Sequence, residues 1–246
     1  MASVEFPLAA LTWLTGDCTG DALVVAASVG VPRLLASADR KVIAVAKDVP
    51  RASRLRGVPG ITPVVARPES LPFASYHFGL VLIHQMFDQF APGLALPELA
   101  RVLRADGYIA TSYFCRDDTV PWVRRLAELL RGIDEDAMPE DTRASAIAPL
   151  LASKYFTKRV SRDFRVWVPI SRQGMLDMVA GQGSIANLER EERLGVLEKV
   201  AAIYDGASRA SELRLPYQLR CWRAQVDHAT LTQPVRLRDD GLAITF

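Results

Sequence analysis

Residues 69–83 read ESLPFASYHFGLVLI, and this stretch with the residues that follow it decides the fold. Its end, 78–84, is a continuous apolar run, which is typical of a parallel strand buried on both faces. Residues 94–104 then have helical spacing, with four apolar side chains on one face: Leu96, Leu99, Val102 and Leu103. A further apolar run at 107–114 follows. We therefore predict a strand–helix–strand unit with parallel strands.

The same alternation precedes this unit. Apolar runs lie at 21–28, 41–46 and 61–66, and helical patterns lie at 31–39 and 48–56. Alternating strands and helices imply right-handed crossovers and a doubly wound sheet with helices on both faces. We predict an α/β fold.

After residue 116 the pattern changes. We predict a helix at 119–131, an exposed loop at 132–145, strands at 160–168 and 215–226, and helices at 171–180 and 189–204. The whole chain, 1–246, is interpreted as a single domain in which 145–215 supplies a helical lid. The C-terminal tail, 229–246, is expected to form a hairpin around Asp240-Gly241. Its apolar end, 241–246, would be an edge strand able to pair with a second copy as a homodimer.

The composition indicates a soluble globular protein. Of 246 residues, 50% are hydrophobic and 24% charged, with a net charge of +2. The arginines are spread out among acids, so no nucleic-acid partner is expected. The three cysteines are far apart in the sequence, which favours reduced thiols in the cytoplasm. We expect no signal peptide, and no apolar run approaches the roughly 20 residues of a transmembrane segment.

Together, several segments resemble class I S-adenosylmethionine-dependent methyltransferases. Residues 69–83 resemble the family's "aE.LPF.d.sFD.V" stretch, and 96–114 (LPELARVLRADGYIATSYF) its "l.E..RVLkPGG.l" stretch. Residues 215–224 (LPYQLRCWRA) resemble the "lPY.t.c.ra" strand of a small-molecule branch, whose late helices resemble 170–200. The resemblance covers residues 10–226. It implies a Rossmann-like, mostly parallel seven-stranded sheet with the cofactor at the carboxyl ends of its strands.

The segment around Gly107 also has a purely local interpretation. RVLRADGY reads as a helix, a C-terminal turn and a strand, with Gly107 in the left-handed conformation of a helix end. This interpretation needs no family relationship.

The resemblance places the first cofactor motif in LVVAASVGVPRLL, 23–35. The family's pattern is an acidic residue followed by G-x-G-x-G. With Gly30 on the last glycine, Ser28 and Ala26 occupy the other two, and Val24 the acidic position. Glycine allows positive φ and a close approach of the backbone to the ligand. A side chain forced into that conformation costs on the order of 1–3 kcal/mol, so we expect this loop to relax into another shape.

By the same resemblance, an acidic residue at the end of the second strand should bind both ribose hydroxyls. Ala46 stands at that position and Lys47 follows it. Asp48 comes two residues late and would have to reach back to the ribose.

The end of the third strand also differs in charge from the family's pattern. Arg67 stands where an aspartate commonly meets the adenine amine, with Glu69 and Leu71 as further positions of the predicted pocket. We hypothesise that Arg33, Lys47 and Arg67 make this pocket suit an anionic ligand.

The sequence offers few catalytic groups. His84, at the end of the fourth strand, is a candidate base, although a structural, hydrogen-bonded histidine is the favoured interpretation. Asp88-Gln89 replaces the His-Trp pair that is frequent in the small-molecule branch. His77 and His228 have no partner at ligand spacing, so no metal site is predicted.

Two functions follow from these observations. The favoured one is a methyltransferase-like protein that is catalytically silent and acts by protein association or by binding an anionic small molecule. The alternative is an active S-adenosylmethionine-dependent methyltransferase acting on a small molecule or lipid precursor.

Overall fold

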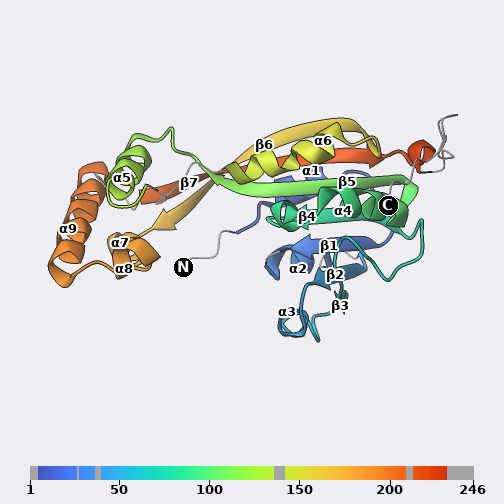
Figure 1. Cartoon of the computed structure of the whole chain (residues 1–246), viewed down its shortest axis with the longest axis horizontal. Helices are drawn as coiled ribbons and strands as arrows, with labels where there is room; N and C mark the ends of the chain where they lie inside the picture. The colour runs from blue at the N-terminus through green and yellow to red at the C-terminus, as the bar shows by residue number, and fades with distance from the viewer. Residues whose placement is uncertain (1–4, 27, 37–39, 136–141, 209–212, 232–246) are drawn as a thin grey trace, which may run out of the picture.

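The computed structural model describes residues 5–26, 28–36, 40–135, 142–208 and 213–231. Its seven-stranded sheet has the order β3-β2-β1-β4-β5-β7-β6 (Figure 1). The strands are β1 (Ala22–Ala26), β2 (Val42–Ala46), β3 (Ile61–Val65), β4 (Phe78–His84), β5 (Leu103–Arg116), β6 (Phe156–Ile170) and β7 (Leu213–Val226). The first five pair in parallel, and β7 is antiparallel to both β5 and β6. The predicted α/β fold with a mostly parallel sheet is confirmed.

Helices cover both faces of this sheet: α1 (Leu8–Thr15), α2 (Gly30–Ala36), α3 (Val49–Ser53), α4 (Pro92–Val102) and α6 (Ala148–Ala152). The other helices are α5 (Pro121–Arg131), α7 (Arg172–Ala180), α8 (Gly183–Ala186) and α9 (Arg190–Ala207). Short 3-10 turns are η1 (Phe87–Gln89), η2 (Thr142–Ile147) and η3 (His228–Thr230). Because side chains alternate along a strand, β1 serves two cores. Leu23 packs in the core with α4 and α6, whereas Val24 packs in the core with α1 and α2.

The junction of α4 and β5 differs from the local interpretation of Gly107. The helix passes directly into β5, and Gly107 does not have positive φ. It lies where the β4–β5 register shifts between the pairs Phe78–Leu103 and Leu80–Tyr108. A Cβ at Gly107 would lie 2.9 Å from the Arg104 carbonyl oxygen. Glycine is thus required for close packing in a bulge, not for a left-handed helix end.

A lobe of helices stands out from one end of the molecule (Figure 1). Helices α5, α7, α8 and α9 share a core there with the ends of β6 and β7. Strand β5 ends at Arg116, opposite Tyr217, while β6 and β7 continue pairing to Ile170 and Leu213. This two-stranded extension carries the lobe beyond the carboxyl ends of the parallel strands.

The range 145–215, expected as a helical lid, divides between two places. Its early part, α6, packs on the sheet with α4, and its middle part is the edge strand β6. Only α7–α9 lie in the lobe, where α5 joins them from outside the predicted range. Strand pairing between β6 and β7 is the reason for this division.

The predicted C-terminal hairpin falls mainly on 232–246, outside the described residues, as does the edge strand at 241–246. In the ranges that the structure describes, no helix has both the length and the apolar character needed to cross a bilayer.

Candidate functional site

A cavity of about 880 Å³ lies at the carboxyl ends of β1 and β2. Its walls come from the segments that follow β1, β2, β3 and β4. Parallel strands leave such a crevice where the strand order reverses, here between β1 and β4. The fold therefore places a ligand site at this edge of the sheet.

The structure brings most of the predicted pocket residues to this cavity. Those that line it are Ala26, Ser28, Ala46, Lys47, Arg67 and Glu69. Gly30, at the start of α2, does not line it. Leu71 is buried in the core beneath α4, and Val24 is fully buried in the core with α1 and α2. Val24, which stands where the family's motif has an acidic residue, is thus packed among apolar side chains.

The described part of the loop after β1 does not have the left-handed backbone of a glycine cradle at Ala26 or Gly30, because neither residue has positive φ. A Cβ at Gly30 would have only the Ser28 hydroxyl oxygen near it, at 3.8 Å. At these two positions the backbone therefore has a conformation that residues with side chains adopt without strain. Ala26 and Ser28 both line the cavity.

The second strand supplies no carboxylate to the cavity. It ends at Ala46, and Asp48 is not part of the cavity wall. Instead, Asp48 caps α3, where its Oδ1 accepts a hydrogen bond of 2.9 Å from the Arg51 backbone N–H. Because this carboxylate satisfies an otherwise unpaired helix donor, it does not reach back toward a ribose.

Glu69 is the one carboxylate among the described lining residues. Its Oε1 accepts a hydrogen bond of 2.9 Å from the Ala91 backbone N–H at the start of α4. Glu69 thus ties the segment after β3 to the segment after β4 and closes one side of the cavity.

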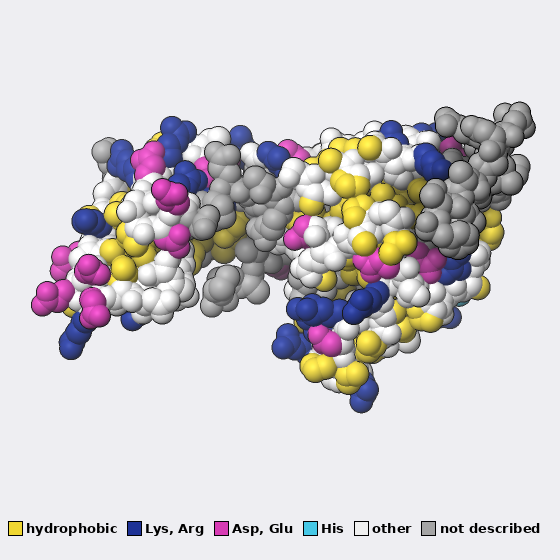
Figure 2. Space-filling model, viewed as in Figure 1, with side chains coloured by type: hydrophobic (Ala, Val, Ile, Leu, Met, Phe, Trp, Pro, Cys, Tyr) yellow, Lys and Arg dark blue, Asp and Glu magenta, His cyan; other side chains and the backbone are white. Residues whose placement is uncertain are grey.

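Basic side chains dominate the opening of the cavity. Five of the lining residues are basic: Arg33, Lys47, Arg51, Arg54 and Arg67. Arg51 lies 4.0 Å from Asp48, whereas the other four are exposed and have no side-chain hydrogen bond or ion pair to any residue that the structure describes. Figure 2 shows these basic side chains gathered beside α2 and α3.

Two of these residues, Arg51 and Arg54, were not predicted from the sequence. Lys47, Arg51 and Arg54 are spaced four and three residues apart, as on one face of a helix, in the segment after the second strand. This spacing could have indicated that all three side chains lie on the same side. Only the fold shows that α3 turns this face toward the cavity.

These residues do not fit S-adenosylmethionine. That cofactor carries a positive sulfonium and a positive ammonium against one carboxylate, and it exposes two ribose hydroxyls. The one carboxylate among the described lining residues, Glu69, accepts a hydrogen bond from the Ala91 N–H, and five basic side chains line one side of the cavity. Like charges in a partly enclosed site repel, and unsatisfied ribose hydroxyls weaken binding further.

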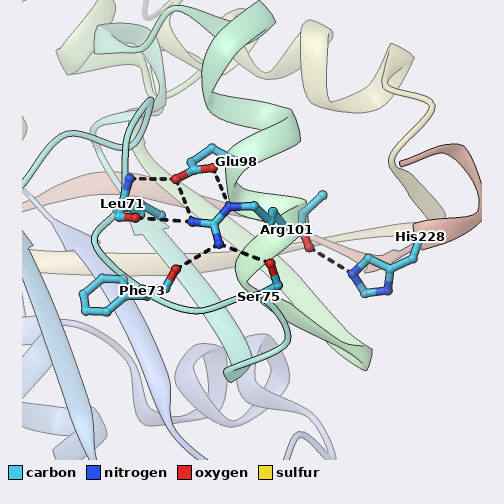
Figure 3. A network of polar contacts seen from close by, with 7 residues as sticks. Leu71, Phe73, Ser75, Glu98, Arg101 and His228 are labelled. Carbon is cyan, nitrogen blue, oxygen red and sulfur yellow. Dashed lines mark hydrogen bonds and ion pairs between the residues drawn. The ribbon is translucent and has the colours of Figure 1, made fainter. Parts of the chain in front are cut away.

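The family-like motifs LPF and E..RVL lie beside this cavity and contact each other (Figure 3). The Glu98 Oε1 accepts a 2.8 Å hydrogen bond from the Leu71 N–H, and Arg101 Nη1 donates to the Phe73 carbonyl at 2.9 Å. Arg101 also pairs with Glu98, which lowers the pKa of that carboxyl chiefly through their hydrogen bond. His228 Nε2 lies 3.0 Å from the Ala100 carbonyl oxygen. The motifs hold the loop before β4 in place and need no ligand to do so.

His84 is buried in the core and does not line the cavity. Its Nδ1 lies 3.0 Å from the Ser112 hydroxyl, and the rings of Phe6 and Phe114 meet it edge-on. Burial lowers the pKa of the imidazole to about 4. The ring is therefore neutral at physiological pH and satisfied by a neighbouring strand, as expected for a structural histidine.

At the position of the family's His-Trp pair, Asp88 accepts a 2.8 Å hydrogen bond from the Tyr113 hydroxyl, while Gln89 lines the cavity. Burial, with Asp88 beside it, raises the pKa of Tyr113, so this phenol is a poor base. Among the described residues, no three His, Cys, Asp or Glu side chains gather as metal ligands would.

Comparisons with known proteins agree with the fold. Residues 16–111 match the family model of the methyltransferase domain. An uncharacterized methyltransferase of Mycobacterium tuberculosis (strain H37Rv) is 29% identical over 181 residues, covering 72% of this chain and 69% of that protein. An uncharacterized methyltransferase of Schizosaccharomyces pombe is 31% identical over 136 residues, covering 52% and 54% of the two chains.

Among solved structures, one described as a type II methyltransferase from Anaeromyxobacter dehalogenans has a TM-score of 0.66 at 18% identity, covering 92% of this chain and 98% of that one. A methyltransferase structure from Anabaena variabilis has a TM-score of 0.61 at 17% identity, covering 89% and 96%. The class defined by this fold is the Rossmann-like methyltransferase. The chain has this fold, and its residues 16–111 resemble the methyltransferase domain.

Proposed function

We propose that this protein is a catalytically silent protein of the methyltransferase fold that binds an anionic small molecule in the cavity at the ends of β1 and β2. One observation carries the proposal. Four exposed basic side chains without a described partner, Arg33, Lys47, Arg54 and Arg67, line a cavity that has one described carboxylate, which accepts a hydrogen bond from the Ala91 N–H. Unpaired cations around a concave site attract and hold anions.

A small ligand is favoured over a protein partner because the four basic side chains line a cavity and not an open surface. A volume of about 880 Å³ lies within the range of small-molecule sites. Arginine, which supplies three of the four basic groups, is suited to phosphate and carboxylate through its planar set of donors.

We also propose that the lobe formed by α5, α7, α8 and α9 acts as a lid on the ligand side. The support is its position. Strand β5 runs parallel to β4, so its carboxyl end, from which the chain leads into α5, points to the same side as the cavity.

A cytoplasmic location is supported by the three unbridged cysteines, Cys18, Cys115 and Cys221.

The second candidate is an active methyltransferase acting on a small molecule or lipid precursor. The open cavity favours it, because it lies at the family's cofactor position. Several relatives are named as uncharacterized methyltransferases. This candidate requires S-adenosylmethionine to bind despite the surrounding positive charge.

Calorimetric titration of the full chain separates the two candidates. S-adenosylmethionine, S-adenosylhomocysteine and inorganic diphosphate would each be titrated at low salt and again at about 0.5 M salt, where charge attraction is screened. We expect diphosphate to bind at low salt and weaken at high salt, and neither adenosyl compound to bind. Micromolar binding of S-adenosylhomocysteine without diphosphate binding would contradict the proposal and support the enzyme.

A matched pair of variants tests whether the anion binds in this cavity. Arg54 lines it, whereas Arg56, two residues later and also exposed, does not. We expect Arg54→Ala to weaken diphosphate binding about fivefold, and Arg56→Ala to leave it unchanged. Equal effects of the two variants would indicate nonspecific attraction to the surface.

A further inference from the structure

We infer that the ligand of this cavity is an amphipathic anion, namely an organic phosphate with an apolar group several carbons long. This inference rests on the proposed function and deepens it. It comes from the way charge and apolar surface divide between the two sides of the cavity.

One side of the cavity is basic. Its charged groups come from segments after the first three strands: Arg33 on α2, Lys47 after β2, Arg54 after α3 and Arg67 after β3. All four are exposed at the opening, and none has a described partner. Groups from three separate connections converge on one volume, so a compact, multiply charged anion contacts several of them together.

The opposite side is apolar. It comes from the segment after β4 and the first turn of α4, and its apolar lining residues are Met86, Phe90, Ala91 and Leu94. Gln89 is its one polar lining side chain, and no described lining residue of this segment is charged. Leu94 is 66% exposed, although it borders a cavity whose floor includes Val25 and Val45. An exposed leucine at the rim of an apolar wall is suited to cover a hydrocarbon group.

The sheet topology keeps the two sides apart. In the order β3-β2-β1-β4, the segments after β2 and β3 lie on one side of β1, and the segment after β4 lies on the other. Glu69 bridges the sides through its hydrogen bond to Ala91, so this carboxylate stays between the basic and the apolar wall. A simple anion would use only half of this cavity. An anion with a hydrocarbon group would use both halves.

Phosphate is the anion that best fits the basic side. Three of its four cations are arginines, whose donors pair with two oxygens of one phosphate, and a phosphate monoester carries more than one negative charge near neutral pH. Alkyl phosphates of two sources share this chemistry, soluble phosphate esters and phospholipids with a monoester headgroup.

The test is calorimetric titration of the full chain with inorganic phosphate, ethyl phosphate and hexyl phosphate, with hexanol as the uncharged counterpart. We expect affinity to rise about twofold to fourfold for each added methylene, and hexanol alone not to bind. If inorganic phosphate binds as tightly as hexyl phosphate, this inference is wrong while the proposed function stands. If no phosphate binds and S-adenosylhomocysteine does, the proposed function itself is wrong.

Two exposed leucines provide matched variants. Leu94 borders the cavity, and Leu8 on α1 is equally exposed, at 66%, but does not line it. We expect Leu94→Ser to lower hexyl phosphate affinity about threefold while inorganic phosphate affinity stays constant, and Leu8→Ser to change neither. Loss of affinity for both phosphates in Leu94→Ser would contradict an apolar role for this wall.

Sedimentation with vesicles distinguishes the two sources. Vesicles of phosphatidylcholine with phosphatidic acid are compared with vesicles of phosphatidylcholine with phosphatidylserine at equal charge. Selective sedimentation with phosphatidic acid, abolished by Leu94→Ser, supports the inference with a lipid as the source. Binding of hexyl phosphate without sedimentation supports it with a soluble ester. Sedimentation equal on both vesicles, with no binding of hexyl phosphate, would overturn it.

Discussion

Glu98 and Arg101 lie one turn apart on α4 and form a two-point ion pair, with Nε–Oε2 and Nη2–Oε1 distances of 2.8 and 2.9 Å. The same two side chains hold the loop before β4 through Leu71 and Phe73. The two stretches that most resemble methyltransferases are therefore one structural unit. Their retention is explained by the fold and carries no information on catalysis.

Replacement of Arg101 by alanine should destabilise the fold. The variant removes hydrogen bonds to the carbonyls of Leu71 and Phe73 and leaves Glu98 without its cation. We expect a loss of about 2 kcal/mol in the free energy of unfolding, measured by urea denaturation. Arg172→Ala is the control, because its pair with Asp205 is exposed on both sides and should contribute much less to stability. Equal losses in the two variants would contradict the role assigned to Arg101.

Gly79 at the start of β4 should not tolerate a side chain. A Cβ there would overlap the carbonyl oxygen of Thr19, a backbone atom that cannot move aside. We expect Gly79→Ala to cost more than about 2 kcal/mol in thermal or urea unfolding. Gly93→Ala is the matched control, since Gly93 lies in the first turn of α4 with nothing within 4 Å of an added Cβ. That variant should be neutral or stabilise by up to about 1 kcal/mol.

His84 predicts how stability depends on pH. Because burial lowers the pKa of the folded imidazole from its ordinary 6.5 to about 4, the unfolded chain takes up a proton first as the pH falls. The contribution of neutral, buried His84 to the free energy of unfolding is therefore constant above pH 6.5. It falls by up to about 3 kcal/mol as the pH drops from 6.5 to 4. Urea unfolding at pH 7, 5.5 and 4.5 would measure it. His84→Gln should flatten this part of the profile, and an unchanged slope in that variant would assign the titration to other groups.

Restoring the family's contacts should restore cofactor binding. The variant Ala26→Gly/Ser28→Gly/Ala46→Asp removes two side chains from the cavity wall and supplies a carboxylate at the end of β2. We expect its affinity for S-adenosylhomocysteine to rise at least tenfold over the natural chain, by calorimetry. The same variant with Ala46→Asn in place of Asp keeps the shape without the charge and should gain much less. Tight binding by the natural chain would show that these contacts are dispensable.

The central strands of the parallel half, β1, β2 and β4, could be predicted from sequence because they are mostly buried on both faces. The run at 78–84, for example, is continuous and apolar and coincides with β4. The long strand β6 was predicted at about half its length, as 160–168 instead of Phe156–Ile170. Most of β6 is exposed at the sheet edge, so its sequence lacks a continuous apolar run.

The candidate site was predicted in part for a similar reason. Ala46, Lys47 and Arg67 lie at or just after strand ends, and strand ends in a parallel sheet meet at one edge, so the sequence places them together. Arg54 lies at the end of α3 and Leu94 on α4, and their positions depend on how these helices pack. Gly30 and Leu71 were included by alignment to the family's motifs, yet neither lines the cavity.

By itself, the sequence determined the alternating strands and helices of the parallel half, the resemblance to class I methyltransferases, and the replacement of glycines and acids at the expected cofactor contacts. These are properties of residue type and spacing along the chain. The tertiary structure decided that Asp48 caps a helix, that His84 is buried against Ser112, and that basic and apolar side chains occupy opposite sides of one cavity. These depend on distances between residues far apart in sequence, which strand order and helix packing set.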